Sequence, residues 1–285
     1  MMLFQEHISL FVDDLKALGR SKATITGYTQ DLTFFEKWLQ QQFNCQVFTE
    51  DIVLEDVEKF LFMLREERQY KPSSMKRMHI ALKMFFQLAW KKKWCTVDIA
   101  SEIKPVRIPQ KERDYLTEQE VMEFVAKMTH KLGKVVVLTL FYSGLRIAEA
   151  LALDVEDVDM EKRKIYVRNG KGNKSRTIPI ADKLYDILVD YCQWRVESDA
   201  FFATEKTGRL SKVRVQALVR ETRQALGWKR TITPHSFRHS FASRLVEKNV
   251  NIVSVSKLLG HSDLKTTSIY THASMSQLEE AVDVL

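Results

Sequence analysis

A basic segment with two prolines restricts how this 285-residue chain can fold more than any other feature of its sequence. The stretch EIKPVRIPQKER at 102–113 contains Pro105 and Pro109, and proline resists helix because it lacks an amide hydrogen and has a fixed backbone angle. The same stretch carries four cations, Lys104, Arg107, Lys111 and Arg113. We interpret residues 104–113 as an extended, basic linker between two domains, at residues 1–103 and 114–285.

The domain before this linker repeats apolar side chains at helical spacing. In the first such stretch Ile8, Phe11 and Leu15 share one face, and Gly19 stops the pattern. Three further helices are expected, from about Thr24, over residues 55–68, and from Ser73 or Ser74 to Trp90. The pattern predicts a compact, all-helical domain.

The domain after the linker mixes helices with a short hairpin. Thr117 and Glu120 have the spacing of a capping box, and the apolar run KVVVLTLFYSG ends at Gly144. The stretches KIYVRNG and SRTIPI alternate like strands around the turn GKGNK, where glycines permit positive φ. Further helices are expected near 181–197, 211–225, 235–248 and 252–259. The fold class is therefore mainly α, with a small antiparallel sheet in the second domain.

The composition favours a polyanionic partner. The net charge is +7 and the pI about 9.2, as in many nucleic-acid-binding proteins, although a basic protein without such a partner would look the same. Three scattered cysteines predict no disulfide framework and no zinc knuckle. The N-terminus does not read as a signal peptide, and no apolar run approaches the roughly 20 residues of a membrane helix. We expect a cytoplasmic protein without a membrane association.

Several cations are candidates for contacts with a phosphate backbone. They lie on the fourth expected helix, in the linker, in the second strand of the hairpin and at the start of the helix near 211–225, as follows: Lys71, Lys76, Arg77, Lys83, Arg107, Lys111, Lys174, Arg176, Lys212 and Arg214. The alternative for each is an ordinary solvated side chain.

Six other residues carry groups that could hold and attack a phosphodiester. They occur in SGLRIAEAL, GKGNKSR, TPHSFRHSF and LLGHSDLKTTSIYTH, and they are Arg146, Lys171, His235, Arg238, His261 and Tyr270. A guanidinium offers a planar fork to phosphate oxygens, and His235 and Arg238 share a face at a helix start that favours an anion. Taken singly, each also has an ordinary explanation as a surface ion pair, a helix cap or a packing residue.

The order and spacing of these motifs closely resemble the tyrosine recombinase (lambda-integrase-like) family, in particular its Xer branch and related transposon and phage integrases. The resemblance implies a SAM-like, core-binding N-terminal domain and a catalytic C-terminal domain. It also implies that Tyr270 attacks a DNA phosphorus to form a 3′-phosphotyrosyl link, with His235 as acid/base helper. One position departs from the family, which often has leucine where Phe237 stands.

The remaining roles follow from the same resemblance. Arg146 and Arg238 would bind the non-bridging oxygens, Lys171 would protonate the departing 5′-oxygen, and His261 would donate a hydrogen bond to the phosphate. Glu149 would orient the site without touching the phosphate. No metal, nucleotide or other cofactor is implied.

The implied partners are double-stranded DNA with an inverted-repeat core site and three further protomers in a synaptic tetramer, either identical or from a paralogue. Two other functions stay open at this point: a type IB topoisomerase that reseals the cut strand to itself, and a non-catalytic DNA-binding regulator. The chain after Tyr270 carries apolar anchors, Leu278, Val282 and Leu285, which could pack within the protomer or on a neighbour.

Overall fold

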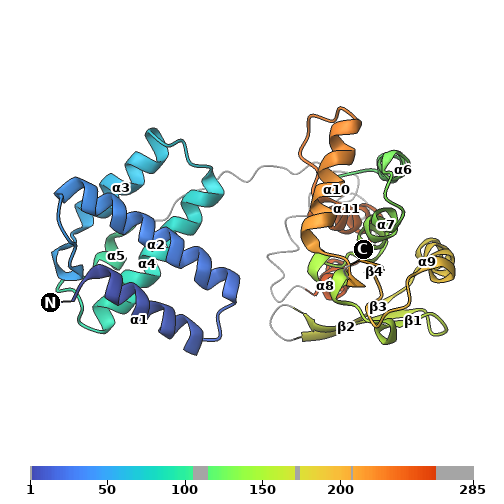
Figure 1. The fold of residues 1–285 in the computed structure, drawn as a ribbon, viewed down its shortest axis with the longest axis horizontal. Helices are drawn as coiled ribbons and strands as arrows, with labels where there is room; N and C mark the ends of the chain where they lie inside the picture. Colours follow the sequence, from blue (N-terminus) through green and yellow to red (C-terminus); the bar gives the residue numbers. More distant parts are fainter. Residues whose placement is uncertain (1, 105–114, 171–173, 207, 261–285) are drawn as a thin grey trace, which may run out of the picture. The chain divides into compact units, whose positions relative to one another are not determined.

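The computed structural model describes residues 2–104, 115–170, 174–206 and 208–260. The chain divides into two compact units, Met1–Glu112 and Arg113–Leu285 (Figure 1). Each unit is described below by itself. Within the described ranges, no helix is both long and apolar enough to cross a membrane.

All the named elements of the first unit, among its described residues, are helices. Its elements are α1 (Phe4–Ala17), α2 (Lys22–Phe43), the 3-10 turn η1 (Thr49–Asp51), α3 (Leu54–Glu66), α4 (Pro72–Lys91) and α5 (Ile99–Glu102). The predicted all-helical architecture is confirmed. The second helix begins two residues before Thr24, because the Ser21 hydroxyl accepts a hydrogen bond from the Thr24 amide at 3.2 Å.

Aromatic side chains from several helices form the core of this unit. Phe35 of α2 packs on Phe60 of α3 with ring centroids 4.9 Å apart, and Phe4 of α1 packs on Phe85 of α4 at 4.8 Å. All four side chains are fully buried. The helical spacing of apolar residues in the sequence therefore corresponds to one shared core.

The second unit has seven helices and two small sheets among its described residues. The helices are α6 (Glu118–Lys127), α7 (Lys131–Ser143), α8 (Ile147–Ala152), α9 (Asp182–Trp194), α10 (Lys212–Ala225), α11 (Pro234–Glu247) and α12 (Ile252–Leu259), with the 3-10 turn η2 (Val155–Asp157). The strands are β1 (Val158–Asp159), β2 (Lys164–Gly170), β3 (Lys174–Pro179), β4 (Ala203–Thr204) and β5 (Gly208–Arg209). The predicted hairpin is β2–β3, whose strands pair antiparallel with Ile165 opposite Ile178. Strand β1 pairs with the other side of β2, so the order in the sheet is β1-β2-β3.

Helix α7 is the central element of this unit. It is apolar on nearly all sides and packs against α9 and α11, which lies beside it (Figure 1). Phe237 of α11, at the position where the resemblance led us to expect leucine, is fully buried and packs on Phe124 of α6 with ring centroids 5.3 Å apart. The candidate site lies where the C-terminal end of α7 meets the N-terminal part of α11.

Candidate functional site

The turn between α7 and α8 positions the first candidate arginine. Gly144 ends α7 in the left-handed conformation, with φ of +65°, and Arg146 then occupies the N-cap of α8. A Cβ atom at Gly144 would lie 2.4 Å from Cδ1 of Phe241, so the turn requires glycine for space as well as for conformation. The prediction that Arg146 lies just beyond a helix end is confirmed.

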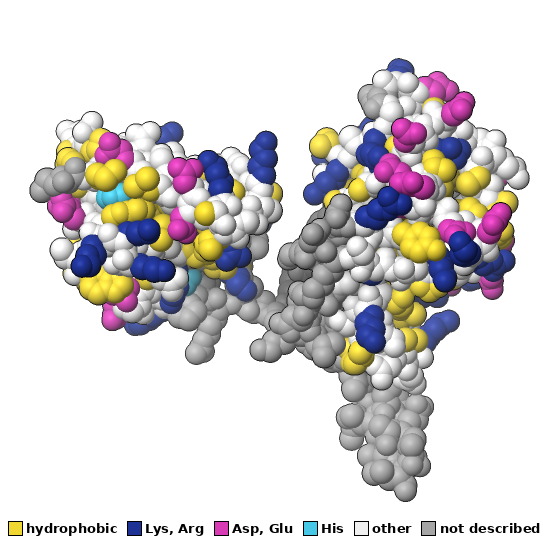
Figure 2. Space-filling model, turned by 90° about the horizontal axis from the view of Figure 1, so that it is seen from below, with side chains coloured by type: hydrophobic (Ala, Val, Ile, Leu, Met, Phe, Trp, Pro, Cys, Tyr) yellow, Lys and Arg dark blue, Asp and Glu magenta, His cyan; other side chains and the backbone are white. Residues whose placement is uncertain are grey.

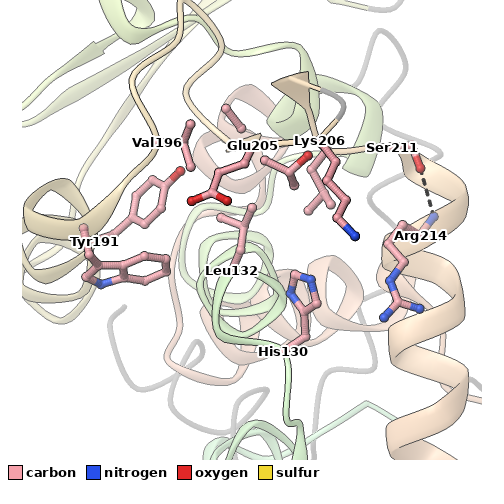
Figure 3. Close-up of a pocket in the computed structure, with 12 residues that line it drawn as sticks. His130, Leu132, Tyr191, Val196, Glu205, Lys206, Ser211 and Arg214 are labelled. Carbon is pink, nitrogen blue, oxygen red and sulfur yellow. Dashed lines mark hydrogen bonds between the residues drawn. The ribbon is translucent and has the colours of Figure 1, made fainter.

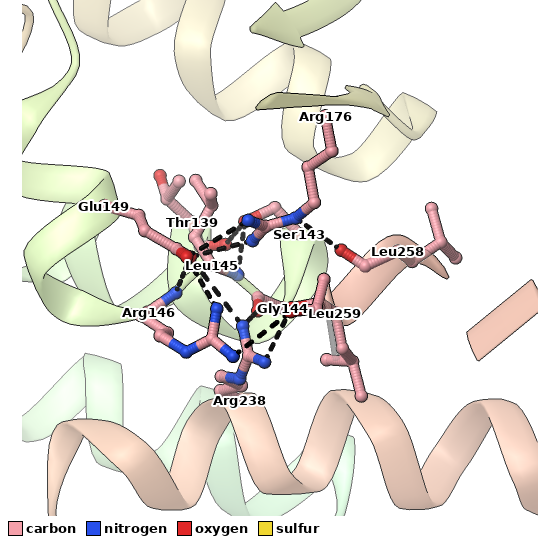
Figure 4. A network of polar contacts seen from close by, with 11 residues as sticks. Thr139, Ser143, Gly144, Leu145, Arg146, Glu149, Arg176, Arg238, Leu258 and Leu259 are labelled. Atoms are coloured by element: carbon pink, nitrogen blue, oxygen red, sulfur yellow. Dashed lines mark hydrogen bonds and ion pairs between the residues drawn. The ribbon is translucent and has the colours of Figure 1, made fainter. Parts of the chain in front are cut away.

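Glu149, in the first turn of α8, gathers cations around one buried carboxylate (Figure 4). Its oxygens accept hydrogen bonds at 2.7 Å from both the backbone amide and the Nη1 of Arg146. They also accept from Nη1 and Nη2 of Arg176 at 3.0 and 2.7 Å. Burial by itself would raise the pKa of Glu149, but the hydrogen bonds from Arg176 and Arg146 lower it to about 2. The carboxylate is therefore charged throughout the neutral range.

Arg238 reaches the same place from α11. Its side chain is only 1% exposed, and its Nη1 lies 3.8 Å from the Oε2 of Glu149. The same Nη1 donates to the carbonyl of Gly144 at 2.6 Å, while Nη2 donates to the carbonyl of Leu259 at 2.8 Å (Figure 4). We call Glu149, Arg146, Arg176 and Arg238 the Glu149 cluster.

The arginines of the Glu149 cluster also bond to backbone carbonyls at the C-terminal end of α12. The Leu258 carbonyl accepts from Nε of Arg176 at 2.9 Å, and the Gly260 carbonyl lies 3.5 Å from Nη2 of Arg146. All three arginines of the cluster thus bind backbone carbonyls at a helix end, where unsatisfied acceptors and the helix dipole favour cations. Gly260 ends α12 with φ of +64°, in agreement with the helix expected near 252–259, and directly precedes His261.

His235 is the second residue of α11 and is exposed. Pro234 occupies the first position of the helix, and the amide of Thr233 donates to the hydroxyl of Ser236 at 3.1 Å. The positive end of the helix dipole favours a bound anion beside His235. Arg238 follows one turn later, so the expected helix start with both groups is confirmed.

The other candidates differ in how far the structure describes them. Lys171, His261 and Tyr270 lie outside the described residues, as do the linker residues Arg107 and Lys111. Lys174 begins β3, but its side chain is likewise outside the description. The structure therefore brings together the candidate residues Arg146, Arg176, Arg238 and Glu149.

The proposed backbone contacts on helices are mostly solvent-facing. Lys71 is the N-cap of α4, Lys76 and Arg77 are exposed on α4, and Lys83 is half-buried further along it. Lys212 and Arg214 are exposed in the first turn of α10. On the face shown in Figure 2, basic and acidic side chains alternate in both units, so surface charge on that face marks no single DNA-binding patch.

Arg77 has a partner that its sequence neighbourhood did not indicate. Its Nε and Nη2 donate to the two carboxylate oxygens of Asp31 on α2, at 2.8 and 2.7 Å. The Asp31 side chain is 5% exposed and that of Arg77 is 52% exposed. Arg77 thus joins α2 to α4 while one side of it stays open to solvent.

A second cluster of charged residues in this unit was not predicted from the sequence. Glu118, at the start of α6, accepts hydrogen bonds from Arg244 at 2.7 Å, Lys183 at 2.6 Å and the hydroxyl of Tyr142 at 2.7 Å. The bonds from Lys183 and Tyr142 are the main reason that the pKa of Glu118 falls to about 2. These partners come from α11, α9 and α7, so no local motif could have indicated them. We call these four residues the Glu118 cluster.

A surface pocket of about 740 Å³ lies elsewhere in the same unit (Figure 3). Leu132 and Tyr191 supply apolar lining, and Lys206 and Arg214 bring positive charge. The hydroxyl of Ser211 accepts from the Arg214 amide at 3.2 Å and so caps α10. The pocket shares no lining residue with the Glu149 cluster.

Comparison with known proteins identifies the class. Residues 114–277 match the phage integrase family, and residues 8–93 match the phage integrase N-terminal SAM-like domain. The chain therefore belongs to the phage integrase family, the tyrosine recombinases, as the motif order indicated.

Individual relatives agree with this family. The chain is 34% identical over 279 residues to tyrosine recombinase XerA of Pyrococcus horikoshii, which covers 96% of this chain and 91% of the relative. It is 27% identical over 275 residues to tyrosine recombinase XerD of Staphylococcus epidermidis, covering 92% of each. These relatives place the chain among the Xer-like members.

Solved structures share its fold. The crystal structure of XerA recombinase matches with a TM-score of 0.53 at 26% identity, covering 99% of this chain and 98% of that one. A lambda integrase dimer bound to a COC′ core site matches with a TM-score of 0.80 at 20% identity, covering 94% and 95%. The protein is a tyrosine-type site-specific DNA recombinase, and the comparisons give no support to the topoisomerase or regulator alternatives.

Proposed function

We propose that this recombinase cuts and rejoins DNA at one site built around the Glu149 cluster, with Tyr270 as its nucleophile. The observation that carries the proposal is the convergence of Arg146 and Arg238, from α8 and α11, on the carbonyl end of α12. The next residue along the chain is His261, and Tyr270 follows nine residues later. The charged groups expected to hold a phosphate are thus bound to the end of the helix that directly precedes His261 in the sequence.

The reaction balances without an external cofactor. The phenol oxygen of Tyr270 attacks the phosphorus while its proton passes to His235, because a phenol with a pKa near 10 must lose its proton during attack. The bond from phosphorus to the 5′-oxygen breaks, and Lys171 gives that oxygen a proton. The product is a 3′-phosphotyrosyl bond and a 5′-hydroxyl. A 5′-hydroxyl of another duplex then attacks this phosphorus by the reverse chemistry, which joins the two strands and releases Tyr270.

The arginines stabilise the charge of the transition state. Arg146 and Arg238 bind the non-bridging oxygens, and His261 donates a further hydrogen bond. Glu149 stays ionised and holds the guanidinium groups in fixed directions without contacting the phosphate, which its own charge would repel. A fixed set of donors costs little reorganisation during the reaction.

The partners follow from the same chemistry. The substrate is double-stranded DNA with an inverted-repeat core site, bound by a tetramer of this chain or of this chain and a paralogue. The solved relatives bound to DNA support a DNA complex, and the exposed cations of α4 and α10 are the proposed backbone contacts. Residues 1–103 would bind the core site, 104–113 would link the domains, and 114–285 would carry the chemistry, in the cytoplasm.

A nicked duplex that loses its 5′-hydroxyl product tests the nucleophile, because cleavage then cannot reverse. Wild-type protein should become covalently joined to the 3′ end, and peptide mapping by mass spectrometry should place the DNA on Tyr270. Tyr270→Phe should bind the duplex with unchanged affinity and form no adduct. An adduct with Tyr270→Phe, or none with wild-type protein, would refute the assignment.

A further inference from the structure

Arg176 has surroundings unlike those of the other cations predicted to contact DNA. Its side chain is 10% exposed, whereas Lys212 and Arg214 lie on the surface. Its guanidinium binds both oxygens of Glu149, at 3.0 and 2.7 Å, and a carbonyl of α12. The geometry points to Arg176 as a positioning residue that aligns the cleavage site through Glu149 and α12, an inference that rests on the proposed function.

The bonds of Arg176 use its planar fork in two directions. Nη1 and Nη2 face the carboxylate of α8, while Nε donates to the Leu258 carbonyl at 2.9 Å (Figure 4). Lysine could not replace this set, because its ammonium is a compact point charge on a flexible stem. One side chain of β3 is therefore joined to two segments that lead to proposed catalytic residues, Arg146 on α8 and His261 after α12.

The close packing of Gly260 against Arg176 supports the same role. A Cβ atom at Gly260 would lie 2.9 Å from Nη1, 3.0 Å from Cδ and 3.1 Å from Cζ of Arg176. The end of α12 thus lies directly against the guanidinium and its stem. Arg176 therefore packs against the backbone of Gly260 as well as bonding to the Leu258 carbonyl.

The charge of Arg176 also protects the orientation of Arg238. Glu149 is 8% exposed, and the Nη1 of Arg238 lies 3.8 Å from it while donating to the Gly144 carbonyl. Without Arg176, the buried carboxylate would lose two charge-assisted hydrogen bonds and would attract Arg238 more strongly. We expect Arg238 to turn toward Glu149 and away from the Gly144 and Leu259 carbonyls, which would misplace a proposed phosphate ligand.

A phosphate contact would have different consequences. To bind DNA directly, the Arg176 guanidinium would have to release Glu149 and leave a buried carboxylate with fewer partners, which is costly. A residue that binds a phosphate also makes the fall of log affinity with log salt steeper by about 0.9. A residue that acts within the protein leaves that slope unchanged.

The test compares Arg176→Gln, Arg176→Lys and the control Lys164→Gln, which removes an exposed charge from the same sheet. Single-turnover cleavage of the nicked duplex is measured at saturating DNA, together with DNA affinity at several salt concentrations and the thermal midpoint. We expect Arg176→Gln to cleave about 100-fold more slowly, since small misplacements of reacting groups have effects of this size. Its affinity should stay within about threefold and its salt slope should not change.

Arg176→Lys keeps the positive charge, and it replaces Arg176→Gln in the test if the glutamine variant folds poorly. It should still cleave about tenfold more slowly, because the fork is lost. Lys164→Gln should cleave at the wild-type rate. Weaker binding with a salt slope shallower by about one, and an unchanged rate at saturation, would show a DNA contact and overturn the inference. A lower thermal midpoint with an unchanged rate for the folded protein would overturn it too.

A double-mutant cycle with Glu149→Gln tests the route by which Arg176 acts. If Arg176 works partly through Glu149, Arg176→Gln should slow cleavage by less than about tenfold once Glu149→Gln is present, because only the bond to the α12 carbonyl is then still lost. Slowing by the full factor in both backgrounds would contradict the inference. Absence of any Tyr270 adduct with wild-type protein would instead refute the proposed function, so the two failures are distinguishable.

Discussion

The Glu118 cluster and the Glu149 cluster of the catalytic unit each surround one ionised glutamate with hydrogen-bond donors, but they serve different purposes. In each, bonds from cations hold a glutamate at a pKa of about 2. The Glu118 side chain is 28% exposed and receives bonds from Lys183, Arg244 and the hydroxyl of Tyr142. The Glu149 side chain is 8% exposed and is surrounded by arginines that also bind backbone carbonyls.

The two clusters differ in the other groups that their cations bind. The arginines of the Glu149 cluster bind helix-end carbonyls as well as a carboxylate, so their planar groups are held in direction as well as in place. Glu118 joins α6, α7, α9 and α11 at a more exposed position, where ion pairs contribute modestly to stability. We infer that the Glu118 cluster supports the fold and that the Glu149 cluster prepares a site for phosphate.

The largest expected difference is between two arginines of one helix. Arg238→Lys should lower the single-turnover cleavage rate by about 10²–10³-fold, as expected for loss of a fixed donor in the transition state. Arg244→Lys, six residues along α11, should change that rate by less than about threefold. Both rates are measured with saturating nicked duplex. Equal losses in the two variants would remove the distinction between the clusters.

The turn beneath the Glu149 cluster gives the next largest effect. Gly144→Ala should lower the free energy of unfolding by about 2–4 kcal/mol, because it combines positive φ with a clash against Phe241. Gly208→Ala is the matched control, since it also has positive φ but its Cβ would meet no heavy atom of the described structure within 4 Å. It should cost about 1 kcal/mol. Denaturant unfolding of both variants checks this, and similar losses would argue against the clash.

The Glu118 cluster should give a smaller, pH-dependent effect. The folded pKa of Glu118, about 2, lies below the ordinary value of 4.5, so the stabilisation is present above pH 4.5 and is lost as the pH falls toward 2. Glu118→Gln should therefore lower the free energy of unfolding by about 1 kcal/mol at pH 7. The gap to wild type should close between about pH 4.5 and pH 2. A gap that is constant with pH would exclude the ionised carboxylate as its cause.

Local features of the site were predictable from sequence, whereas contacts between distant segments were not. Gly144 was predicted to end its helix, and the helix expected near 252–259 ends at Gly260, because glycine commonly adopts the left-handed conformation at such ends. Arg146 and Glu149 are three residues apart, so their pairing was visible as well. The helices of the first unit followed from the spacing of their apolar residues.

The partners that give these residues their roles come from tertiary packing. Arg238 meets the Gly144 carbonyl 94 residues away, and Arg77 meets Asp31 46 residues away. The sequence predicted that Arg176, on the hairpin, contacts a phosphate backbone. Its actual partner Glu149 lies 27 residues earlier in another element, so that pair was not visible in the sequence. No periodicity or local motif specifies such pairs.

The most direct test of the comparison is the single-turnover rate of covalent adduct formation by Glu149→Gln and Glu118→Gln. Both variants remove one negative charge from a carboxylate whose pKa is about 2. Each is saturated with the nicked duplex at neutral pH, so that differences in DNA affinity do not enter. We predict that Glu149→Gln slows adduct formation by about 10–100-fold and that Glu118→Gln changes it by less than about threefold. Equal rates for the two variants, or a larger loss for Glu118→Gln, would contradict the assignment of the Glu149 cluster as the cleavage site.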